Sequence, residues 1–280
     1  MANKILVTGA GGYIGRHVVK RLCDMGEDVI AADIRTDGID TRANIVSCNI
    51  FSGSETVYEE LGCPDTVIHM AWRDGFVHNS NAHMQDLSAH YTFIKNMIGK
   101  GIKQLVVMGT MHEVGYHEGA IDENTPCEPT SMYGIAKDAL RRSTIQLTQR
   151  SNVCLQWLRA YYIYGDDARS NSIFAKLTKA AEDGKTTFPF TTGKNKYDFI
   201  EVDKLAEQIA TVAVQNEVTG IINCCTGEPV SLADKVESFI KEHGFNIKLE
   251  YGAFPDRPYD SPGVWGDASK INAVMKNARH

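Results

Sequence analysis

Tyr133 and Lys137 are the pair of residues in this 280-residue chain best suited to proton transfer. They lie in the segment PTSMYGIAK (129–137), at the start of a helix predicted over residues 131–149. Because they are four residues apart, their side chains leave the same face of that helix. A phenol with a pKa of about 10 is a poor base at neutral pH, but a neighbouring ammonium would stabilise the phenolate and lower that pKa. The pair therefore predicts proton exchange with a substrate oxygen.

A third chemical group comes from the strand that precedes this helix. Thr110 follows the apolar run QLVVM (104–108), and its hydroxyl is able to hold a substrate oxygen beside the phenol. The next residues, His112-Glu113-x-x-x-His117, come close to a zinc motif. HExxH places its histidines four apart on one helical face, whereas these two are five apart. We therefore expect no protein-bound metal.

A glycine-rich turn at the N-terminus predicts a dinucleotide site. The strand KILV (4–7) leads into Gly9, Gly12 and Gly15 and then into a helix over 13–25. Such glycines permit a tight turn, a close approach of the backbone to a pyrophosphate, and close packing of helix on strand. Asp33 ends the second predicted strand, where a carboxylate accepts hydrogen bonds from an adenosine ribose.

Two neighbouring residues give opposite indications about the form of the dinucleotide. Asp33 would repel a 2′-phosphate, which favours NAD. Arg35 would pair with that phosphate, which favours NADP. We predict NAD and leave NADP open as the alternative. In the oxidised cofactor, the positive nicotinamide would act together with the ammonium in lowering the pKa of the Tyr133 phenol.

The elements that position these residues follow an alternating pattern. Apolar runs at 4–7, 28–32, 44–48, 66–70, 104–108 and 154–158 alternate with helical stretches at 13–25, 52–61, 81–99 and 131–149. Apolar strands separated by helices indicate a doubly wound parallel sheet, an α/β fold. Later elements are helices at 171–183, 202–215 and 231–243, a strand at 220–224, a helix from 268, and an irregular stretch over 192–197.

Domain organisation follows from where this pattern loosens. We predict a dinucleotide-binding core over residues 1–165, to which part of 194–225 returns. Residues 166–280 are predicted to form mainly a smaller, interleaved substrate-binding lobe. No linker rich in Pro, Gly or Ser separates the two parts.

Composition excludes several classes of function. A net charge of −6, with 43% hydrophobic and 23% charged residues, is typical of a globular protein. The absence of a basic run argues against nucleic acid as a partner. The sequence has neither a signal-peptide pattern nor a window of about 18 apolar residues, so we predict a cytoplasmic protein that does not bind membranes. The seven cysteines form no CxxC pair, which indicates reduced thiols.

Taken together, these motifs resemble those of the extended short-chain dehydrogenases/reductases, in the NAD-dependent epimerase/dehydratase family that acts on nucleotide sugars. The resemblance covers nearly the whole chain through TGAGGYIG (8–15), VIHMAW (67–72), YGIAK (133–137), LRAYYIYG (158–165), YDFIEVDKLAEQI (197–209), INCCTGEPVSL (222–232) and DRPYDSPGVWGDASKI (256–271). It implies a Rossmann fold and a catalytic triad of Thr110, Tyr133 and Lys137, with Lys137 also holding the nicotinamide ribose. It also implies a homodimer formed through 81–99 and 131–149.

Further site residues follow from the motif positions. The predicted cofactor site comprises Gly9, Gly12, Tyr13, Ile14, Gly15, Asp33, Ile34, Arg35, Asn49, Ile50, Met70, Ala71, Trp72, Met108, Tyr133, Lys137 and Tyr161. The predicted substrate contacts are Arg73, Met111, His112, Tyr162 and Arg257, the last at a position that binds the nucleotide diphosphate in relatives. We interpret His78, His83 and His90 as a solvated helix face.

Departures from the family pattern narrow the chemistry. Met111 and His112 occupy the positions where 4,6-dehydratases carry Asp-Glu, which argues against dehydration. Met111 also replaces the cysteine of the epimerase-reductases that make fucose nucleotides, and a thioether cannot abstract a proton. Other departures are Asp86 for Asn, Asn49-Ile50 for Asp-Leu, and Tyr162 for the Asn of the LRxxN motif.

The dinucleotide site, the Tyr133 phenol, Lys137 and the Thr110 hydroxyl are sufficient for hydride transfer. We predict NAD(P)H-dependent reduction of a 4-keto-6-deoxyhexose nucleotide, in which Tyr133 supplies the proton. The alternatives are a nucleotide-sugar 4-epimerase, a sugar or uronate dehydrogenase, and a cofactor-sensing regulatory protein on the same fold.

Overall fold

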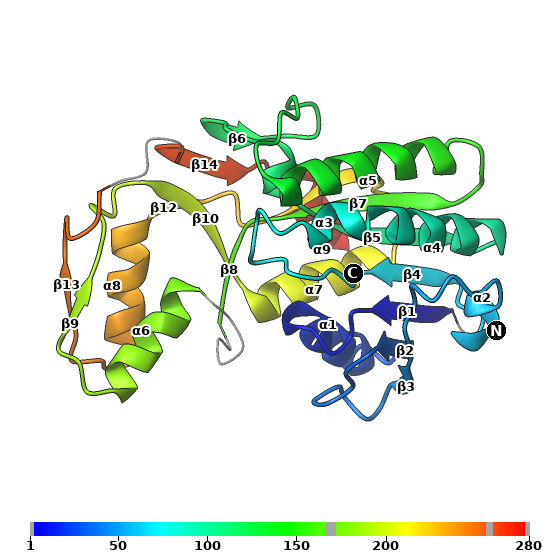
Figure 1. Ribbon diagram of the computed structural model, residues 1–280, viewed down its shortest axis with the longest axis horizontal. Coiled ribbons are helices and arrows are strands. Elements are labelled where there is room, and N and C mark those ends of the chain that lie inside the picture. The colour runs from blue at the N-terminus through cyan, green and yellow to red at the C-terminus, as the bar shows by residue number, and fades with distance from the viewer. Residues whose placement is uncertain (1–2, 166–171, 256–259, 278–280) are drawn as a thin grey trace.

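Seven parallel strands form the main sheet of the computed structural model, which describes residues 3–165, 172–255 and 260–277. Their spatial order is β11-β7-β5-β4-β1-β2-β3, and every neighbouring pair is parallel. The strands are β1 (Lys4–Thr8), β2 (Asp28–Asp33), β3 (Asn44–Ser47), β4 (Thr66–His69), β5 (Gln104–Thr110), β7 (Cys154–Ala160) and β11 (Gly220–Cys224). The predicted doubly wound sheet is confirmed (Figure 1).

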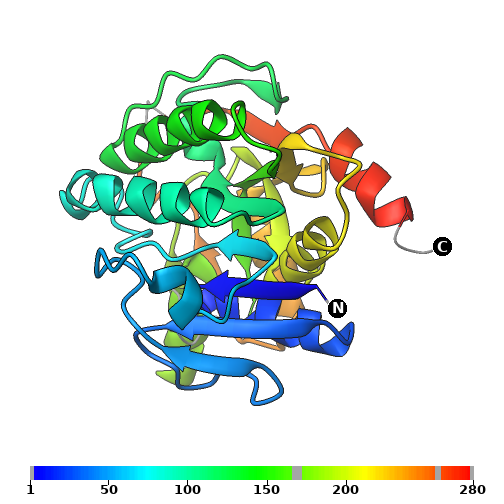
Figure 2. The same ribbon diagram turned by 90° about the vertical axis from the view of Figure 1, so that its right-hand side faces the viewer.

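Helices cover both faces of this sheet, which is why its strands are apolar rather than alternating. All residues of β4 and β5 are buried. On one face α4 (Leu87–Gly99) packs against α5 (Met132–Thr148), and on the other α7 (Val202–Ala213) packs against α1 (Tyr13–Asp24) and α9 (Ser269–Asn277). Figure 2 shows α4 and α5 on one side of the strands and α7 and α9 on the other.

Two predicted helices are shorter than the sequence pattern indicated. The helix expected over 81–99 is divided at Asp86 into α3 (Ala82–Gln85) and α4, with Asp86 ending one and beginning the other. The Asp86 carboxylate there accepts two 2.9 Å hydrogen bonds from Arg73. The helix expected over 52–61 is reduced to α2 (Val57–Glu60), because Gly53 has a left-handed backbone with φ of 77°.

A second sheet was not predicted. It runs β12 (Pro229–Ser231), β10 (Lys196–Glu201), β14 (Gly263–Gly266) and β6 (Gly119–Ile121), and β8 (Tyr162–Tyr164) also pairs with β10. The prediction of an irregular stretch over 192–197 is wrong at its end, because β10 begins at Lys196. Strands this short carry too little periodicity to be recognised. The buried Asp198 carboxylate fastens this sheet by accepting hydrogen bonds from the backbone of Thr226, Gly227 and Gly266.

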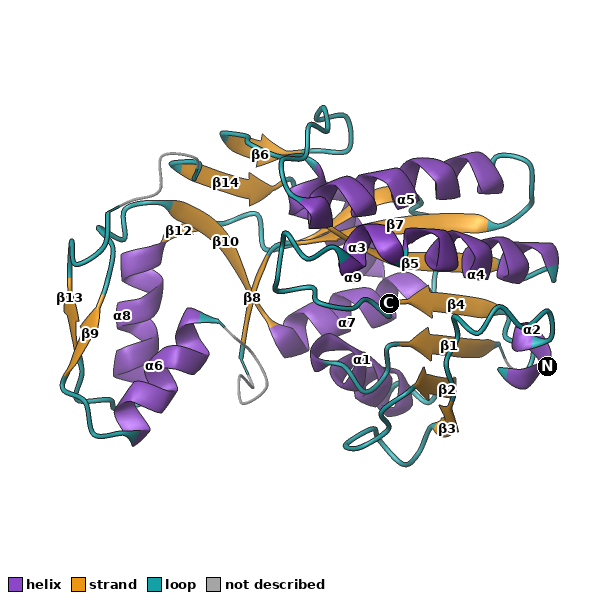
Figure 3. Ribbon diagram, viewed as in Figure 1, coloured by secondary structure: helices purple, strands orange, loops and turns teal. Residues whose placement is uncertain are grey.

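A smaller lobe lies beyond the carboxyl ends of the main strands (Figure 3). It contains α6 (Ile173–Glu182), α8 (Leu232–Glu242) and the parallel pair β9 (Thr187–Pro189) and β13 (Lys248–Glu250). The elements α7 and β11 follow residue 165 but pack in the main layers, and the division into two domains stays a prediction. Within the described ranges, no helix has the length and apolar character needed to cross a membrane.

Candidate active site

The glycine turn joins β1 to α1 and packs against the end of β4. Gly9 has a φ of 70°, and a Cβ added there would lie 2.7 Å from the backbone nitrogen of Ala71. A Cβ at Gly15 would lie 2.0 Å from the Gly9 carbonyl oxygen. Gly12 begins α1 with no side chain capping the helix. The tight turn and close helix packing expected of these glycines therefore have a steric basis, and the uncapped helix start suits an anion.

Asp33 lies beside this turn at the end of β2. Its carboxylate accepts hydrogen bonds from the backbone N–H of Gly11, at 2.9 Å, and of Arg35, at 3.0 Å. A carboxylate has further lone pairs beyond these two, so it is able to accept from ribose hydroxyls as well. The next residue, Ile34, is 68% exposed and offers an apolar surface. The Arg35 side chain is exposed and forms no ion pair with any described residue.

The other predicted cofactor residues reach the same edge of the sheet from neighbouring strands. Met70 and Ala71, after β4, donate their backbone N–H groups to Thr8 Oγ1 at 3.2 and 3.3 Å. After β3, Asn49 is exposed and Ile50 is buried. The carboxyl edge of a parallel sheet is where doubly wound folds bind ligands, so these residues form a coherent candidate cofactor site.

The three candidate catalytic residues come together where α5 packs on the end of β5. The start of α5 is capped by Ser131, whose Oγ accepts from the Gly134 N–H at 3.1 Å. Lys137 is 3% exposed, and its Nζ donates to the Met108 carbonyl oxygen at 2.6 Å. The same Nζ lies 6.0 Å from the centroid of the Tyr133 ring. The i, i+4 pair therefore faces the sheet end as expected.

The Thr110 hydroxyl is positioned by the short turn that follows β5. Thr110 Oγ1 accepts from the His112 N–H at 3.3 Å, and Glu113 Oε1 accepts from the Thr110 N–H at 2.8 Å. A hydrogen bond to Thr110 lowers the pKa of Tyr133, but burial raises that pKa by more. The pKa of the phenol is thus raised in the protein alone, and the lowering expected from the ammonium together with an oxidised nicotinamide stays a prediction for the complex. The neutral phenol is the proton-donating form.

Burial acts in the opposite direction on the lysine. It lowers the pKa of Lys137 to about 7, while the negative charge of Glu113 opposes the shift. Desolvation penalises the charged form of any buried group, which for an amine means a lowered pKa. Lys137 therefore titrates near neutral pH.

Histidines surround the phenol. The His78 ring stacks on Tyr133 with centroids 5.6 Å apart, and the His112 ring lies 4.4 Å from His78. Burial, followed by the charge of His78, lowers the pKa of His112 to about 4. The solvated-face interpretation is wrong for His83 and His90, which are each 1% exposed. These two rings both stack on Trp72, with centroids 6.1 and 4.3 Å from it.

The other residues predicted to contact substrate or cofactor are held mainly by contacts within the protein. Arg73 is held by Asp86, Met111 is buried in the core, and the Tyr162 ring packs 4.3 Å from Tyr197. Tyr161 is buried beside Gly266, where an added Cβ would lie 2.8 Å from its ring. Tyr13 donates its hydroxyl hydrogen to the Gly165 carbonyl, Ile14 packs against the core, and Arg257 lies outside the described residues.

Glu113 is a site residue that sequence reasoning missed. It is 0% exposed, and besides the Thr110 N–H its carboxylate accepts from Trp157 Nε1 at 2.9 Å. Arg141 Nε and Arg159 Nε lie 3.4 and 3.5 Å from Glu113 Oε2. Thr110 and Glu113 have the spacing of a capping box, S/T-x-x-E, and that pattern was the available signal. Glu113 holds the backbone from which the Thr110 hydroxyl projects.

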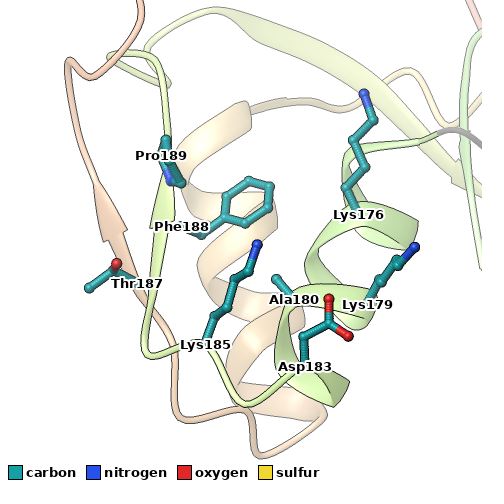
Figure 4. Close-up of a pocket in the computed structure, with 8 residues that line it drawn as sticks. All are labelled: Lys176, Lys179, Ala180, Asp183, Lys185, Thr187, Phe188 and Pro189. Carbon is teal, nitrogen blue, oxygen red and sulfur yellow. The ribbon is translucent and has the colours of Figure 1, made fainter.

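A groove of about 270 Å³ lies in the smaller lobe, between α6 and β9. Figure 4 shows Lys176 and Lys179 on one side of it, with Lys185 and Phe188 on the other. Its lining combines three ammonium groups, the Asp183 carboxylate and an aromatic ring. None of the candidate catalytic residues lines this groove.

Comparisons with known proteins bear on the whole chain. The model of a family described as the NAD dependent epimerase/dehydratase family matches residues 5–225. A dTDP-6-deoxy-L-talose 4-dehydrogenase (NAD(+)) of Aggregatibacter actinomycetemcomitans is 43% identical over 269 residues, which cover 94% of this chain and 98% of the relative. A probable UDP-arabinose 4-epimerase of Oryza sativa subsp. japonica is 26% identical, with 99% and 76% covered.

Solved structures show the same fold. The UDP-glucose 4-epimerase of Thermus thermophilus, in complex with NAD, superposes with a TM-score of 0.83 at 20% identity, covering 97% of this chain and 93% of that one. The UDP-glucose 4-epimerase of Thermotoga maritima, with UDP-glucose, gives a TM-score of 0.81 at 22% identity, with 96% and 91% covered.

Proposed function

Because the chain belongs to the NAD dependent epimerase/dehydratase family, we propose that it interconverts the hydroxyl and the ketone at position 4 of a nucleotide-linked 6-deoxyhexose. The relative at 43% identity is named for 4-dehydrogenation of dTDP-6-deoxy-L-talose with NAD(+). The observation that carries the proposal is that Lys137 and the Thr110 hydroxyl both lie beside Tyr133, at the carboxyl edge of the sheet.

The residues at this edge fit a dinucleotide. The glycine turn keeps side chains away from the start of α1, and Asp33 is fixed beside it by two backbone N–H groups. These residues would hold the cofactor, which would supply the redox chemistry at position 4 by accepting a hydride as NAD+ or returning it as NADH. The Asp33 carboxylate would repel a 2′-phosphate, which supports NAD over NADP.

The proton steps are assigned to residues of this chain. During reduction, the neutral phenol of Tyr133 gives its proton to the sugar oxygen, and during oxidation the phenolate takes it back. Thr110 Oγ1 accepts from the His112 N–H, which leaves the hydroxyl hydrogen to be donated to the same sugar oxygen. The ammonium of Lys137 stabilises the phenolate when it forms.

Substrate contacts beyond the reacting oxygen remain proposals. His112 is adjacent to the phenol and suits a hydrogen bond to the sugar, since its lowered pKa keeps the ring neutral at physiological pH. Arg257 is proposed for the diphosphate. Arg73 has to leave Asp86 before it can contact an anion. Homodimer formation through α4 and α5 and a cytoplasmic location stay predictions.

The test is an absorbance assay of reduced nicotinamide with purified full-length protein. We expect dTDP-6-deoxy-L-talose to reduce NAD+ in stoichiometric amounts, and NADP+ to react more slowly. UDP-glucose and UDP-arabinose serve as the epimerase panel, with products separated by chromatography. Interconversion of these sugars without net reduction of NAD+, together with no reaction of the deoxytalose, would overturn the proposal and favour a 4-epimerase.

A further inference from the structure

The ammonium of Lys137 lies over an aromatic ring. Its Nζ is 3.8 Å from the centroid of the Trp72 ring, and its hydrogen-bond partner is the Met108 carbonyl at 2.6 Å. Within the described residues, Lys137 forms no ion pair with a carboxylate. A cation above an indole face is attracted by the ring quadrupole, and the attraction is stronger when the cation is desolvated. Lys137 meets both conditions.

We propose that Trp72 is a positioning residue for Lys137, whose indole face keeps the ammonium protonated and directed toward Tyr133. The inference deepens the proposed function because it concerns the lysine assigned to the proton step. Trp72 also lies edge-on to the Tyr133 ring, with centroids 6.0 Å apart. The indole is thus in contact with both members of the pair.

Hydrogen bonds fix the orientation of the indole. Trp72 Nε1 donates to His83 Nδ1 at 3.0 Å, and His83 Nε2 lies 2.9 Å from the Val77 carbonyl oxygen. An indole N–H only donates and a carbonyl only accepts, so His83 accepts at Nδ1 and donates at Nε2. Each polar atom in this link has its matching partner. A rotation of the indole away from Lys137 would break it.

The surface against which the indole packs is uncharged. The His90 ring stacks on Trp72 with centroids 4.3 Å apart, and His69 Nε2 lies 2.9 Å from His90 Nδ1. Thr8 Oγ1 accepts from two backbone N–H groups, so it donates its own hydrogen to His69 Nδ1, 2.9 Å away. His69 then donates from Nε2 to His90. This order of donors keeps both rings neutral.

Among the described residues, the charged and titratable groups that interact with Lys137 are Glu113 from the turn after β5, His69 from β4, His90 from α4 and Tyr133 on α5 itself. His83 from α3 contacts Trp72 and Tyr133. Burial lowers the pKa of His69 to about 3 and lowers the pKa of His90 as well, so neither histidine adds a competing positive charge. Glu113 favours the charged lysine from a distance, whereas Trp72 favours it by contact.

The direct test is the titration of Lys137 by NMR in the full-length protein without cofactor or substrate. Lysine is labelled with 13C at Cε, and the Lys137 signal is assigned with Lys137→Arg. We expect Trp72→Leu, which keeps an apolar wall but removes the π face, to lower the pKa of Lys137 by about one unit. Trp72→Phe keeps a smaller face and should give a smaller decrease. An unchanged or raised pKa in Trp72→Leu would overturn the proposal.

Two further variants separate positioning from general damage. Trp265→Leu makes the same chemical change in β14, and we expect the pKa of Lys137 to stay at the wild-type value. His83→Leu leaves Trp72 present but removes its hydrogen bond, so it should lower the pKa of Lys137 by less than Trp72→Leu does. Equal decreases in Trp265→Leu and Trp72→Leu would contradict the proposal. So would an unchanged pKa in His83→Leu, the variant that decides the matter if Trp72→Leu does not fold.

A kinetic measurement connects the inference to turnover. With less positive charge at Lys137, the phenolate is harder to form, so the acid limb of the oxidation profile in Trp72→Leu should move to higher pH. The expected loss near neutral pH is about tenfold. The titration needs no substrate, so an inactive wild-type protein would count against the proposed function and leave the inference about Trp72 standing.

Discussion

Two buried cations in this protein have opposite surroundings. Arg159 is 0% exposed and has the Glu113 carboxylate 3.5 Å from Nε, the Asp122 carbonyl 2.9 Å from Nη1 and Cys127 Sγ 3.2 Å from Nη2. Lys137 is 3% exposed and has one carbonyl and one aromatic face. Burial without a paired carboxylate lowers a lysine pKa, whereas a paired guanidinium keeps its charge. Arg159, whose charge is balanced by Glu113, supports the structure, whereas Lys137, which has no carboxylate partner, is available for proton chemistry.

Glu113 connects the surroundings of Arg159 with the candidate catalytic residues. Its carboxylate lies beside Arg141 and Arg159, and it also accepts from the Thr110 N–H. Gly109 makes this arrangement sterically feasible, because a Cβ there would lie 2.2 Å from Trp157 Nε1. The structural ion cluster thus fixes the backbone of a candidate catalytic residue. A variant of the candidate catalytic residue Tyr133 should therefore change the reaction rate, whereas a variant of the cluster around Glu113 should change the free energy of unfolding.

The largest effect is expected at the phenol. Tyr133→Phe removes the proton donor and leaves both cations unchanged, so kcat should fall by about 10³-fold. The affinity for NAD, measured by fluorescence titration, should change by less than about twofold, since the hydroxyl acts on the sugar oxygen. A loss of rate below about tenfold would remove Tyr133 from the proton step.

The next largest effect is expected on stability, at the carboxylate that pairs with Arg159. Glu113→Gln removes the negative charge between Arg141 and Arg159, and we expect the free energy of unfolding to fall by about 3 kcal/mol, since breaking a buried pair leaves an uncompensated charge. Urea unfolding followed by circular dichroism measures it. Glu118→Gln, at an exposed position, is the matched control and should leave the midpoint unchanged. Equal midpoints for Glu113→Gln and wild type would show that this cluster does not stabilise the fold.

The sequence predicted that Tyr133 and Lys137 share a helix face, but it did not predict the cluster around Glu113 and Arg159, and the difference has a physical reason. The glycine turn and the Tyr133–Lys137 pair are local patterns, whose geometry follows from a few consecutive residues. Glu113 acquires its role from Arg159, which is 46 residues away in the chain and reaches it through the order of strands in the sheet. No local pattern reports such a partner.

The same reasoning explains the histidines and the second sheet. His83 and His90 are seven residues apart and so share one face of the helical pattern; that face looks solvated in the sequence, but both rings stack on Trp72. The main strands were found because strands buried on both faces are continuous apolar runs. Strands such as β6 and β12, of three residues each, gain their identity from pairing with distant segments.

The third prediction uses pH to separate the two cations. The pKa of Lys137 is about 7 in the folded protein and about 10.4 when unfolded, so between these values the unfolded chain binds more protons and stability rises with pH. Relative to Lys137→Met, wild type should gain about 2 kcal/mol between about pH 7.5 and pH 9. Urea unfolding of both proteins across that range measures the difference. If the difference in unfolding free energy between the two proteins does not change with pH, the lysine keeps its proton in the folded protein.

The smallest effect is expected at Asp33, a carboxylate whose surroundings differ from those of Glu113. Glu113 is surrounded by cations, whereas Asp33 is held by the N–H groups of Gly11 and Arg35 and keeps capacity for a ligand. Asp33→Asn retains the shape and removes the charge, so the ratio of kcat/KM for NADP+ over NAD+ should rise about tenfold, because the Arg35 guanidinium is then unopposed beside a 2′-phosphate. Adding Arg35→Ala should cancel the gain. If the ratio stays constant in Asp33→Asn, the carboxylate does not face the ribose, and the half-buried anion at the end of β2 has another role.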